Sequence, residues 1–196
     1  MKTNKALWSA ILILAVALTA CKNDKKEKQE EETTQEKVTE VKKSEPQKTV
    51  QFELFSKSNS TASGKVSFTE KDGKVHMYAK LIGLTPGTHA IHIHEKADCS
   101  AADGTSTGGH WNPTFENHGK WGAAEGYHKG DIGNFEANEE GYGSVEFSTD
   151  EWCIGCDDEK KNIIGKSVIV HAGADDFTSQ PSGDAGARVS CGGVIQ

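Results

Sequence analysis

Residues 64–79 have the sequence GKVSFTEKDGKVHMYA, and this stretch decides the fold class. Apolar and polar residues alternate in Gly64–Phe68 and again in Val75–Ala79, which is the period of a β-strand with two different faces. Asp72 and Gly73 lie between the two runs, and an Asp-Gly pair in this position is a strong signal for a hairpin turn. The stretch therefore predicts two antiparallel strands joined by a short turn.

Similar short runs occur on both sides of this hairpin. They are Gln51–Phe55, Ala90–His94, Gly143–Phe147, Ser167–His171 and Gly186–Ile195. Helical periodicity is weak and glycine-rich turns recur, so the sequence predicts an all-β, antiparallel sandwich or barrel. Residues 97–130 show little strand pattern, and a loop of that length in a compact domain usually has a function or a metal to hold it.

The beginning of the chain differs from the rest. Lys2 and Lys5 precede an apolar run, Leu7–Leu18, which is shorter than the ~20 residues of a membrane-spanning helix and is typical of a signal peptide. The run ends in Leu18-Thr19-Ala20-Cys21, which resembles a bacterial lipobox. We therefore expect residues 1–20 to be removed and Cys21 to carry a lipid. The alternative is an ordinary secretory signal that ends near a cysteine.

Residues 22–48 contain no aromatic residue and are mostly Lys, Glu, Gln and Thr. Such a segment buries too little apolar surface to offset the entropy of ordering, which predicts a disordered tether, with a marginal charged helix as the alternative. The predicted organisation is a signal peptide (1–20), a lipidated cysteine with its tether (21–49) and a folded domain (50–196). It implies an exported protein anchored to a membrane of the bacterial cell envelope, on the periplasmic side or at the cell surface.

The folded domain is acidic and contains four cysteines. Residues 50–196 carry 12 basic and 21 acidic side chains, a formal charge of −9, which argues against nucleic acid as a partner. The cysteines that follow Cys21 are Cys99, Cys153, Cys156 and Cys191. An even number of cysteines in an exported domain predicts two disulfides, for which three pairings exist.

The histidines of the domain follow a pattern that suits metal binding. His92 and His94 lie two residues apart in a predicted strand, so that both imidazoles point to the same face. Three histidines and one aspartate in or near the long loop are enough for a closed four-ligand zinc site. The further candidate ligands, in chain order, are His110, His118, His128, Asp131 and His171.

Several motifs resemble those of copper–zinc superoxide dismutases. They are His92-x-His94-Glu95, Gly109-His110-x-Asn112-Pro113, His128-x-x-Asp131-x-Gly133-Asn134, Val170-His171 followed by Ala174-Asp175-Asp176, and Gly183–Val194 with its Arg188 and Cys191. They recur in the order of the family over about residues 50–196, with a slightly longer interval between His118 and His128. The resemblance implies a Greek-key β-sandwich or barrel of about eight strands with long metal-binding loops. It also implies an antioxidant oxidoreductase that converts superoxide to oxygen and hydrogen peroxide.

The resemblance further implies a role for individual residues. The implied copper ligands are His92, His94, His110 and His171, and the implied zinc ligands are His110, His118, His128 and Asp131. His110 would bridge both metals and take part in proton transfer, while Asp175 would tie a copper ligand to a zinc ligand. Arg188, the only arginine in the chain, would lie beside the copper and attract superoxide. Members of the family differ in oligomeric state, so the resemblance implies none for this chain.

The resemblance implies a disulfide between Cys99 and Cys191. Cys153 and Cys156 form a CxxC motif that is foreign to the common family pattern. Such a motif can be a redox centre or half of a metal site, but no βαβ pattern surrounds it here, and we expect a local disulfide.

Two other classes of protein are alternatives to an enzyme: a copper carrier built on the same fold, and a lipid-tethered structural domain that binds only zinc. The complete set of His92, His94 and His171 argues against the zinc-only domain, and the presence of Arg188 together with every ligand argues against the carrier.

Overall fold

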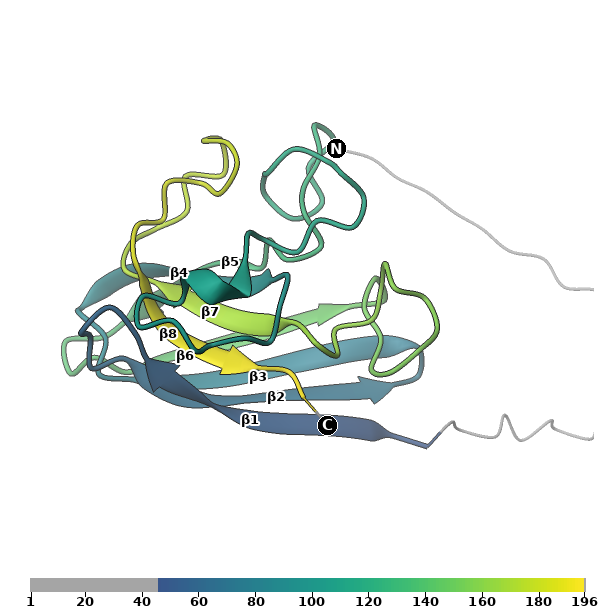
Figure 1. Cartoon of the computed structure of the whole chain (residues 1–196), viewed down its shortest axis with the longest axis horizontal. Helices are drawn as coiled ribbons and strands as arrows, with labels where there is room; N and C mark the ends of the chain where they lie inside the picture. Colours follow the sequence, from purple (N-terminus) through teal and green to yellow (C-terminus); the bar gives the residue numbers. More distant parts are fainter. Residues whose placement is uncertain (1–45, 196) are drawn as a thin grey trace, which may run out of the picture. The chain divides into compact units, whose positions relative to one another are not determined.

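The computed structural model describes residues 46–195 of the chain (Figure 1). Eight strands close into an antiparallel barrel with the neighbour order β1-β2-β3-β6-β5-β4-β7-β8, which confirms the predicted all-β antiparallel fold. The strands are β1 Lys48–Ser56, β2 Ser63–Lys71, β3 Lys74–Ile82, β4 Gly87–His94, β5 Gly133–Ala137, β6 Gly143–Thr149, β7 Ser167–His171 and β8 Arg188–Gly193. One 3-10 turn, η1 at Thr105–Thr107, lies in the long loop after β4.

The hairpin predicted between residues 64 and 79 is formed by β2 and β3. Lys71 pairs with Lys74, and the two residues between them have positive φ angles, 52° at Asp72 and 76° at Gly73. A two-residue turn with both φ angles positive matches the twist of antiparallel strands, and Asp-Gly is among the few pairs that adopt it without much strain.

The first strand begins earlier than the sequence predicted. Lys48 and Thr49, which were assigned to the tether, belong to β1 and pair with Glu70 and Thr69 of β2. Lys48 also donates from Nζ to the carbonyl of Ile154 at 2.9 Å. The boundary was wrong because both side chains are exposed, and exposed strand ends lack the alternation that marks a strand in the sequence.

The core of the barrel is made by the inward-facing residues of its strands. In β3 every second side chain is buried, as the alternation in the sequence predicts. The fully buried residues include Val66, Phe68, Val75, Ala79, Ile91 and Ile93.

The sequence analysis did not predict strand β5. This strand pairs with β4 along its whole length but with β6 only at Ala137 and Gly143. Its inward residues are Gly133, Phe135 and Ala137, of which only Phe135 is large and apolar, so its alternation is weak.

Two disulfides are present, Cys99–Cys191 and Cys153–Cys156, with Cα–Cα distances of 5.9 and 6.0 Å. Residues 46–195 include no helix of the length and apolarity needed to cross a membrane. The predicted signal peptide, Cys21 and the tether up to residue 45 lie outside the described residues.

Candidate metal centre

Two neighbouring strands supply three histidines to one site. His92 and His94 lie on β4, and β4 pairs with β7, where His171 is the last residue. The register between β7 and β8 shifts between Val170 and His171, a local irregularity of the kind that redirects a side chain. All three imidazoles are 5 % exposed or less.

The long loop folds back against β4 and delivers the remaining candidate ligands. His110 forms an isolated bridge with His94. Next to it, Trp111 donates its backbone N–H to the carbonyl of Ile93 at 2.8 Å, and Ile93 donates its N–H to the carbonyl of Gly130 at 2.9 Å. A Cβ at position 130 would lie 2.1 Å from the Ile93 carbonyl oxygen, so only glycine permits this close approach.

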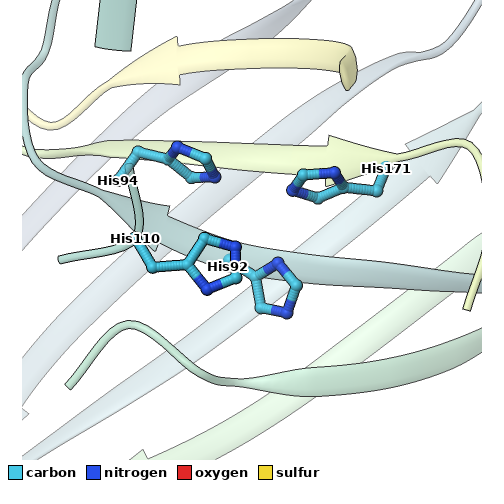
Figure 2. Close-up of side chains that lie close together, drawn as sticks. All are labelled: His92, His94, His110 and His171. Carbon is cyan, nitrogen blue, oxygen red and sulfur yellow. The ribbon is translucent and has the colours of Figure 1, made fainter. Parts of the chain in front are cut away.

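The seven candidate ligands gather in two sets that share His110. Within each set, one possible ligand atom per residue lies within 4.8 Å of the others. The first set comes from β4, β7 and the loop and contains His92, His94, His110 and His171 (Figure 2). The second set lies in the loop and contains His110, His118, His128 and Asp131.

Unpaired nitrogens show that both sets suit metal ions. Among the described residues, one buried ring nitrogen of each of the six candidate-ligand histidines has no hydrogen-bond partner. A buried polar atom without a partner is costly, and a metal ion removes this cost. Four imidazoles suit copper(II), and three imidazoles with one carboxylate suit zinc. The unpaired atoms are His92 Nδ1, His94 Nε2, His110 Nε2, His118 Nδ1, His128 Nδ1 and His171 Nε2.

Asp131 is the centre of the second set. Its Oδ1 lies 2.8 Å from His110 Nδ1 and 3.3 Å from His128 Nδ1, and its Oδ2 lies 3.0 Å from His118 Nδ1. The backbone N–H of His128 also donates to Oδ2, at 2.8 Å. Burial acts to raise the pKa of Asp131, but the three imidazoles close to its carboxylate outweigh burial and lower this pKa well below its usual range. The second set therefore contains an ionised carboxylate.

Asp175 connects the two sets. Its Oδ2 lies 2.8 Å from His92 Nε2, and its Oδ1 lies 2.9 Å from His118 Nε2. Asn134 on β5 holds this aspartate through two backbone contacts of 2.8 Å each, one to the N–H and one to the carbonyl. Gly183 passes so close that a Cβ there would lie 1.8 Å from Asp175 Oδ1.

Three histidines of the first set, His94, His110 and His171, are neutral near pH 7. Burial lowers the pKa of His110 to about 4 and, together with the nearby His92, lowers that of His171 to about 3. Burial also lowers the pKa of His94 well below its usual value. A neutral imidazole has the lone pair that a metal requires, so these residues need not lose a proton before they bind one.

His118 behaves differently from the histidines of the first set. Burial acts to lower its pKa, but the nearby carboxylates of Asp131 and Asp175 outweigh burial and raise this pKa to about 9. A metal ion that binds to His118 must therefore displace a proton near neutral pH.

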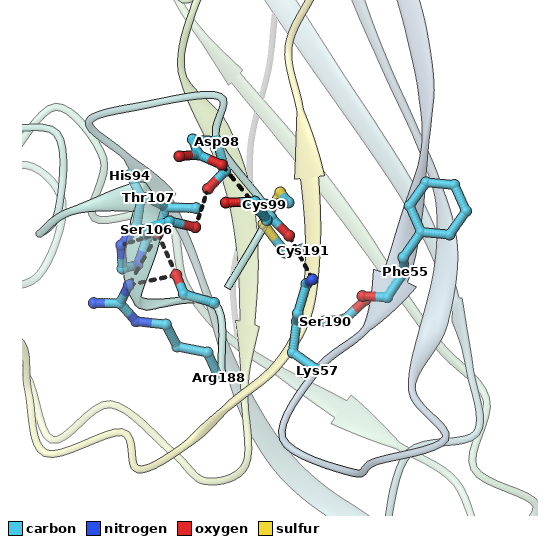
Figure 3. The surroundings of a disulfide bond; sticks show 12 residues. Phe55, Lys57, His94, Asp98, Cys99, Ser106, Thr107, Arg188, Ser190 and Cys191 are labelled. Atoms are coloured by element: carbon cyan, nitrogen blue, oxygen red, sulfur yellow. Dashed lines mark hydrogen bonds between the residues drawn. A yellow bond between two sulfur atoms is a disulfide. The ribbon is translucent and has the colours of Figure 1, made fainter. Parts of the chain in front are cut away.

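Arg188 lies near His94, one member of the first set (Figure 3). Its Nη1 donates to the carbonyl of Gly104 at 2.8 Å and to Thr107 Oγ1 at 2.9 Å. Both acceptors belong to the loop that the Cys99–Cys191 disulfide joins to β8. The side chain is partly buried, and the two hydrogen bonds hold its Nη1 against the loop. Burial lowers the pKa of Arg188, but a guanidinium stays charged at every physiological pH.

The structure also identifies supporting residues to which the sequence analysis gave no role. His89 is 2 % exposed, and its ring nitrogens lie 2.8 Å from the carbonyl oxygens of His171 and Thr85. Gln180 holds the backbone of His118 through its N–H and its carbonyl, both at 2.9 Å. Neither residue is a candidate ligand; each fixes the backbone of one.

Comparison with known proteins agrees with this geometry. The family model for copper/zinc superoxide dismutase matches residues 62–195. The extracellular Cu-Zn superoxide dismutase of Drosophila melanogaster is 37 % identical over 142 residues, which cover 68 % of this chain and 76 % of that protein. Superoxide dismutase [Cu-Zn] 2 of Mesembryanthemum crystallinum is 35 % identical over 141 residues, which cover 68 % of this chain and 87 % of that protein.

Solved structures agree as well. A SOD-like protein from Bacillus subtilis superposes with a TM-score of 0.65 at 31 % identity, covering 75 % of this chain and 97 % of that one. A double mutant of a SOD-like protein from the same species gives a TM-score of 0.66 at 32 % identity, covering 76 % and 97 %. The chain thus belongs to the copper/zinc superoxide dismutase family and is an oxidoreductase that uses copper and zinc to disproportionate superoxide.

Proposed function

We propose that the two histidine sets divide the metals between them and that this chain removes superoxide outside the cytoplasm. In this proposal copper binds to His92, His94, His110 and His171, and zinc binds to His110, His118, His128 and Asp131. When bound, copper supplies the one-electron redox chemistry that disproportionation requires, and zinc supplies a fixed positive charge.

The observation that carries the proposal is the position of His110 between the sets. Its Nε2 is buried without a partner, while its Nδ1 lies 2.8 Å from Asp131. A single ring therefore presents one nitrogen to each set. Superoxide reduction consumes protons, and His110 Nε2 is the atom that takes up and releases a proton beside the substrate.

The other residues keep this arrangement in place and attract the substrate. Asp175 accepts hydrogen bonds from His92 and His118, which fixes the orientation of one ring in each set. Arg188 is held by Gly104 and Thr107, and its permanent charge attracts the superoxide anion to the copper side.

The location outside the cytoplasm has three supports. Two disulfides are typical of exported proteins. One relative is named an extracellular enzyme. The first 21 residues resemble a lipoprotein signal that ends at Cys21. We therefore infer an enzyme tethered by lipid to the bacterial envelope, which it protects from superoxide.

Replacement of His110 tests the proposal. We expect His110→Ala to abolish superoxide removal and to weaken the binding of both metals, because the ring serves both sets. His76→Ala is the matched control, since His76 is exposed on β3 and belongs to neither set. Metal content is measured by mass spectrometry and superoxide removal by pulse radiolysis. A His110→Ala enzyme with full turnover and both metals would contradict the shared-ligand assignment.

A further inference from the structure

The segment that follows β6 holds the chain on both sides of His128. The Trp152 indole N–H donates to the carbonyl of Lys129 at 2.8 Å, and the Tyr127 hydroxyl donates to Glu151 Oε1 at 2.7 Å. Lys129 also forms an ion pair with the other carboxylate oxygen of Glu151. Three contacts therefore bind Tyr127 and Lys129, the two neighbours of His128, to Glu151 and Trp152.

Aromatic packing ties the same residues to the barrel. Trp152 is 2 % exposed and packs edge-on against Phe68 of the core, with ring centroids 5.9 Å apart. On its other side it packs against Trp121 at 5.6 Å, and Trp121 packs against Tyr127 at 4.9 Å. Trp121 lies three residues after His118, and Tyr127 immediately precedes His128. The aromatic cluster therefore supports the loop near both His118 and His128.

The Cys153–Cys156 disulfide restrains the chain immediately after Trp152. Cys153 donates its N–H to the carbonyl of Lys161 at 2.8 Å and accepts from the N–H of Ile163 at 3.1 Å. The Asn162 side chain bonds to Gly155 N–H at 3.0 Å and to the carbonyl of Cys156 at 3.0 Å, which closes the CxxC turn. The turn is therefore held at both ends, and Trp152 immediately precedes it.

We propose that Glu151 and Trp152, held by the Cys153–Cys156 disulfide, are positioning residues that fix residues 127–129 so that His128 stays in place to bind zinc. The inference rests on the proposed zinc set. Trp152 acts on the backbone beside His128, at the carbonyl of Lys129, and Glu151 acts through the side chains of Tyr127 and Lys129. A ligand that is held in position returns to a metal faster than it diffuses away, so loss of the support accelerates zinc release.

The test measures zinc release from the full-length, copper- and zinc-loaded protein into a chromogenic chelator. Glu151→Gln removes the ion pair, Trp152→Phe removes the indole N–H, and Cys153→Ser/Cys156→Ser removes the disulfide. We expect each variant to release zinc about ten-fold faster, in line with the loss of an outer support of a metal site. Glu146→Gln is the matched control for Glu151→Gln, because Glu146 is exposed on β6, and it should release zinc at the wild-type rate.

Two further measurements separate positioning from general stability. Copper content should stay close to wild type in Glu151→Gln and Trp152→Phe. The denaturant midpoint of the metal-free protein should stay close to wild type in Glu151→Gln, whereas Trp152→Phe also lowers it because it shortens a buried side chain. Zinc release at the control rate in both variants would overturn the inference and leave the zinc set standing. A His128→Ala variant that retains zinc as tightly as the wild type would instead refute the proposed zinc set.

Discussion

Arg188 is held by the long loop and also carries the charge that we expect to attract superoxide. Hydrogen bonds to Gly104 and Thr107 occupy one part of the guanidinium. The planar, permanently charged group has five N–H donors, so others are left to face an anion. The structural and the guiding role can therefore belong to the same side chain.

Substitution of Arg188 tests the guiding role. We expect kcat/KM to fall modestly in Arg188→Lys, by about ten-fold in Arg188→Ala and further in Arg188→Glu, with both metals retained. Added salt should slow the wild type more than Arg188→Ala, because ions screen the attraction. Lys80→Glu makes the same change in net charge on an exposed part of β3 and should have little effect. Wild-type kcat/KM in metal-replete Arg188→Glu at low salt would exclude guidance by this residue.

In the proposed zinc set, His118 should make zinc binding depend on pH. Its pKa in the metal-free protein is raised to about 9, so the ring is protonated at pH 7 and must become neutral to bind zinc. Protons therefore compete with zinc below about pH 9, and zinc affinity should rise as pH increases from 6 towards 9. Chelator competition at several pH values measures this slope, and His118→Asn should flatten it. Equal zinc affinity of the wild type at pH 6 and pH 8 would contradict the assignment.

At the scale of elements, the Cys99–Cys191 disulfide joins the metal-bearing loop to the last strand. Its cysteines are 92 residues apart in the chain, and Cys191 pairs with Phe55 of β1 and Ile169 of β7. The loop after β4 binds the side chain of Arg188. The disulfide attaches this loop to β8, a strand of the barrel.

Removal of this disulfide should destabilise the metal-free protein. Closing a loop of this length is worth about 4–5 kcal/mol in the chain-entropy model. We therefore expect Cys99→Ser/Cys191→Ser to lower the free energy of unfolding by up to that amount in a denaturant titration. The matched variant Cys153→Ser/Cys156→Ser opens a loop with a separation of only 3 residues and should cost much less. An equal loss in the two variants would show that loop length does not determine the effect.

At the scale of the whole molecule, the charge of the domain opposes its substrate. Residues 50–196 carry a formal charge of −9, and two divalent metals with loss of one His110 proton change it only to −6. A negative domain repels a superoxide anion at long range, so attraction must be local, and we propose that Arg188 and the metals supply it.

Attachment to a membrane is the second property of the whole chain that can be tested. We expect Cys21→Ser to abolish partition into the detergent phase and sedimentation with membranes, because the proposed lipid is the anchor. Cys99→Ser/Cys191→Ser serves as the control, since it also removes thiols but leaves Cys21 intact, and it should still sediment with membranes. A Cys21→Ser protein that stays with the membrane fraction would point to another anchor.

Local sequence alone determined the fold class and the choice of candidate ligands. The alternation in residues 64–79, with Asp72 and Gly73 at the turn, depends only on neighbouring residues and predicted the β2–β3 hairpin correctly. His92 and His94 share a face because the side-chain period of a strand is two. The other candidate ligands were assigned from the resemblance to a family, and that resemblance also rests on short motifs of neighbouring residues.

Only the tertiary structure revealed strand β5 and the contacts that support the candidate ligands. The sequence did not predict β5, because Gly133 and Ala137 are small and the strand is held by its pairing with β4. Gln180 supports His118 across 62 residues, and Trp152 supports Lys129 across 23. Contacts of this kind depend on where the folded backbone places two distant groups, so they leave no periodicity or spacing in the chain itself.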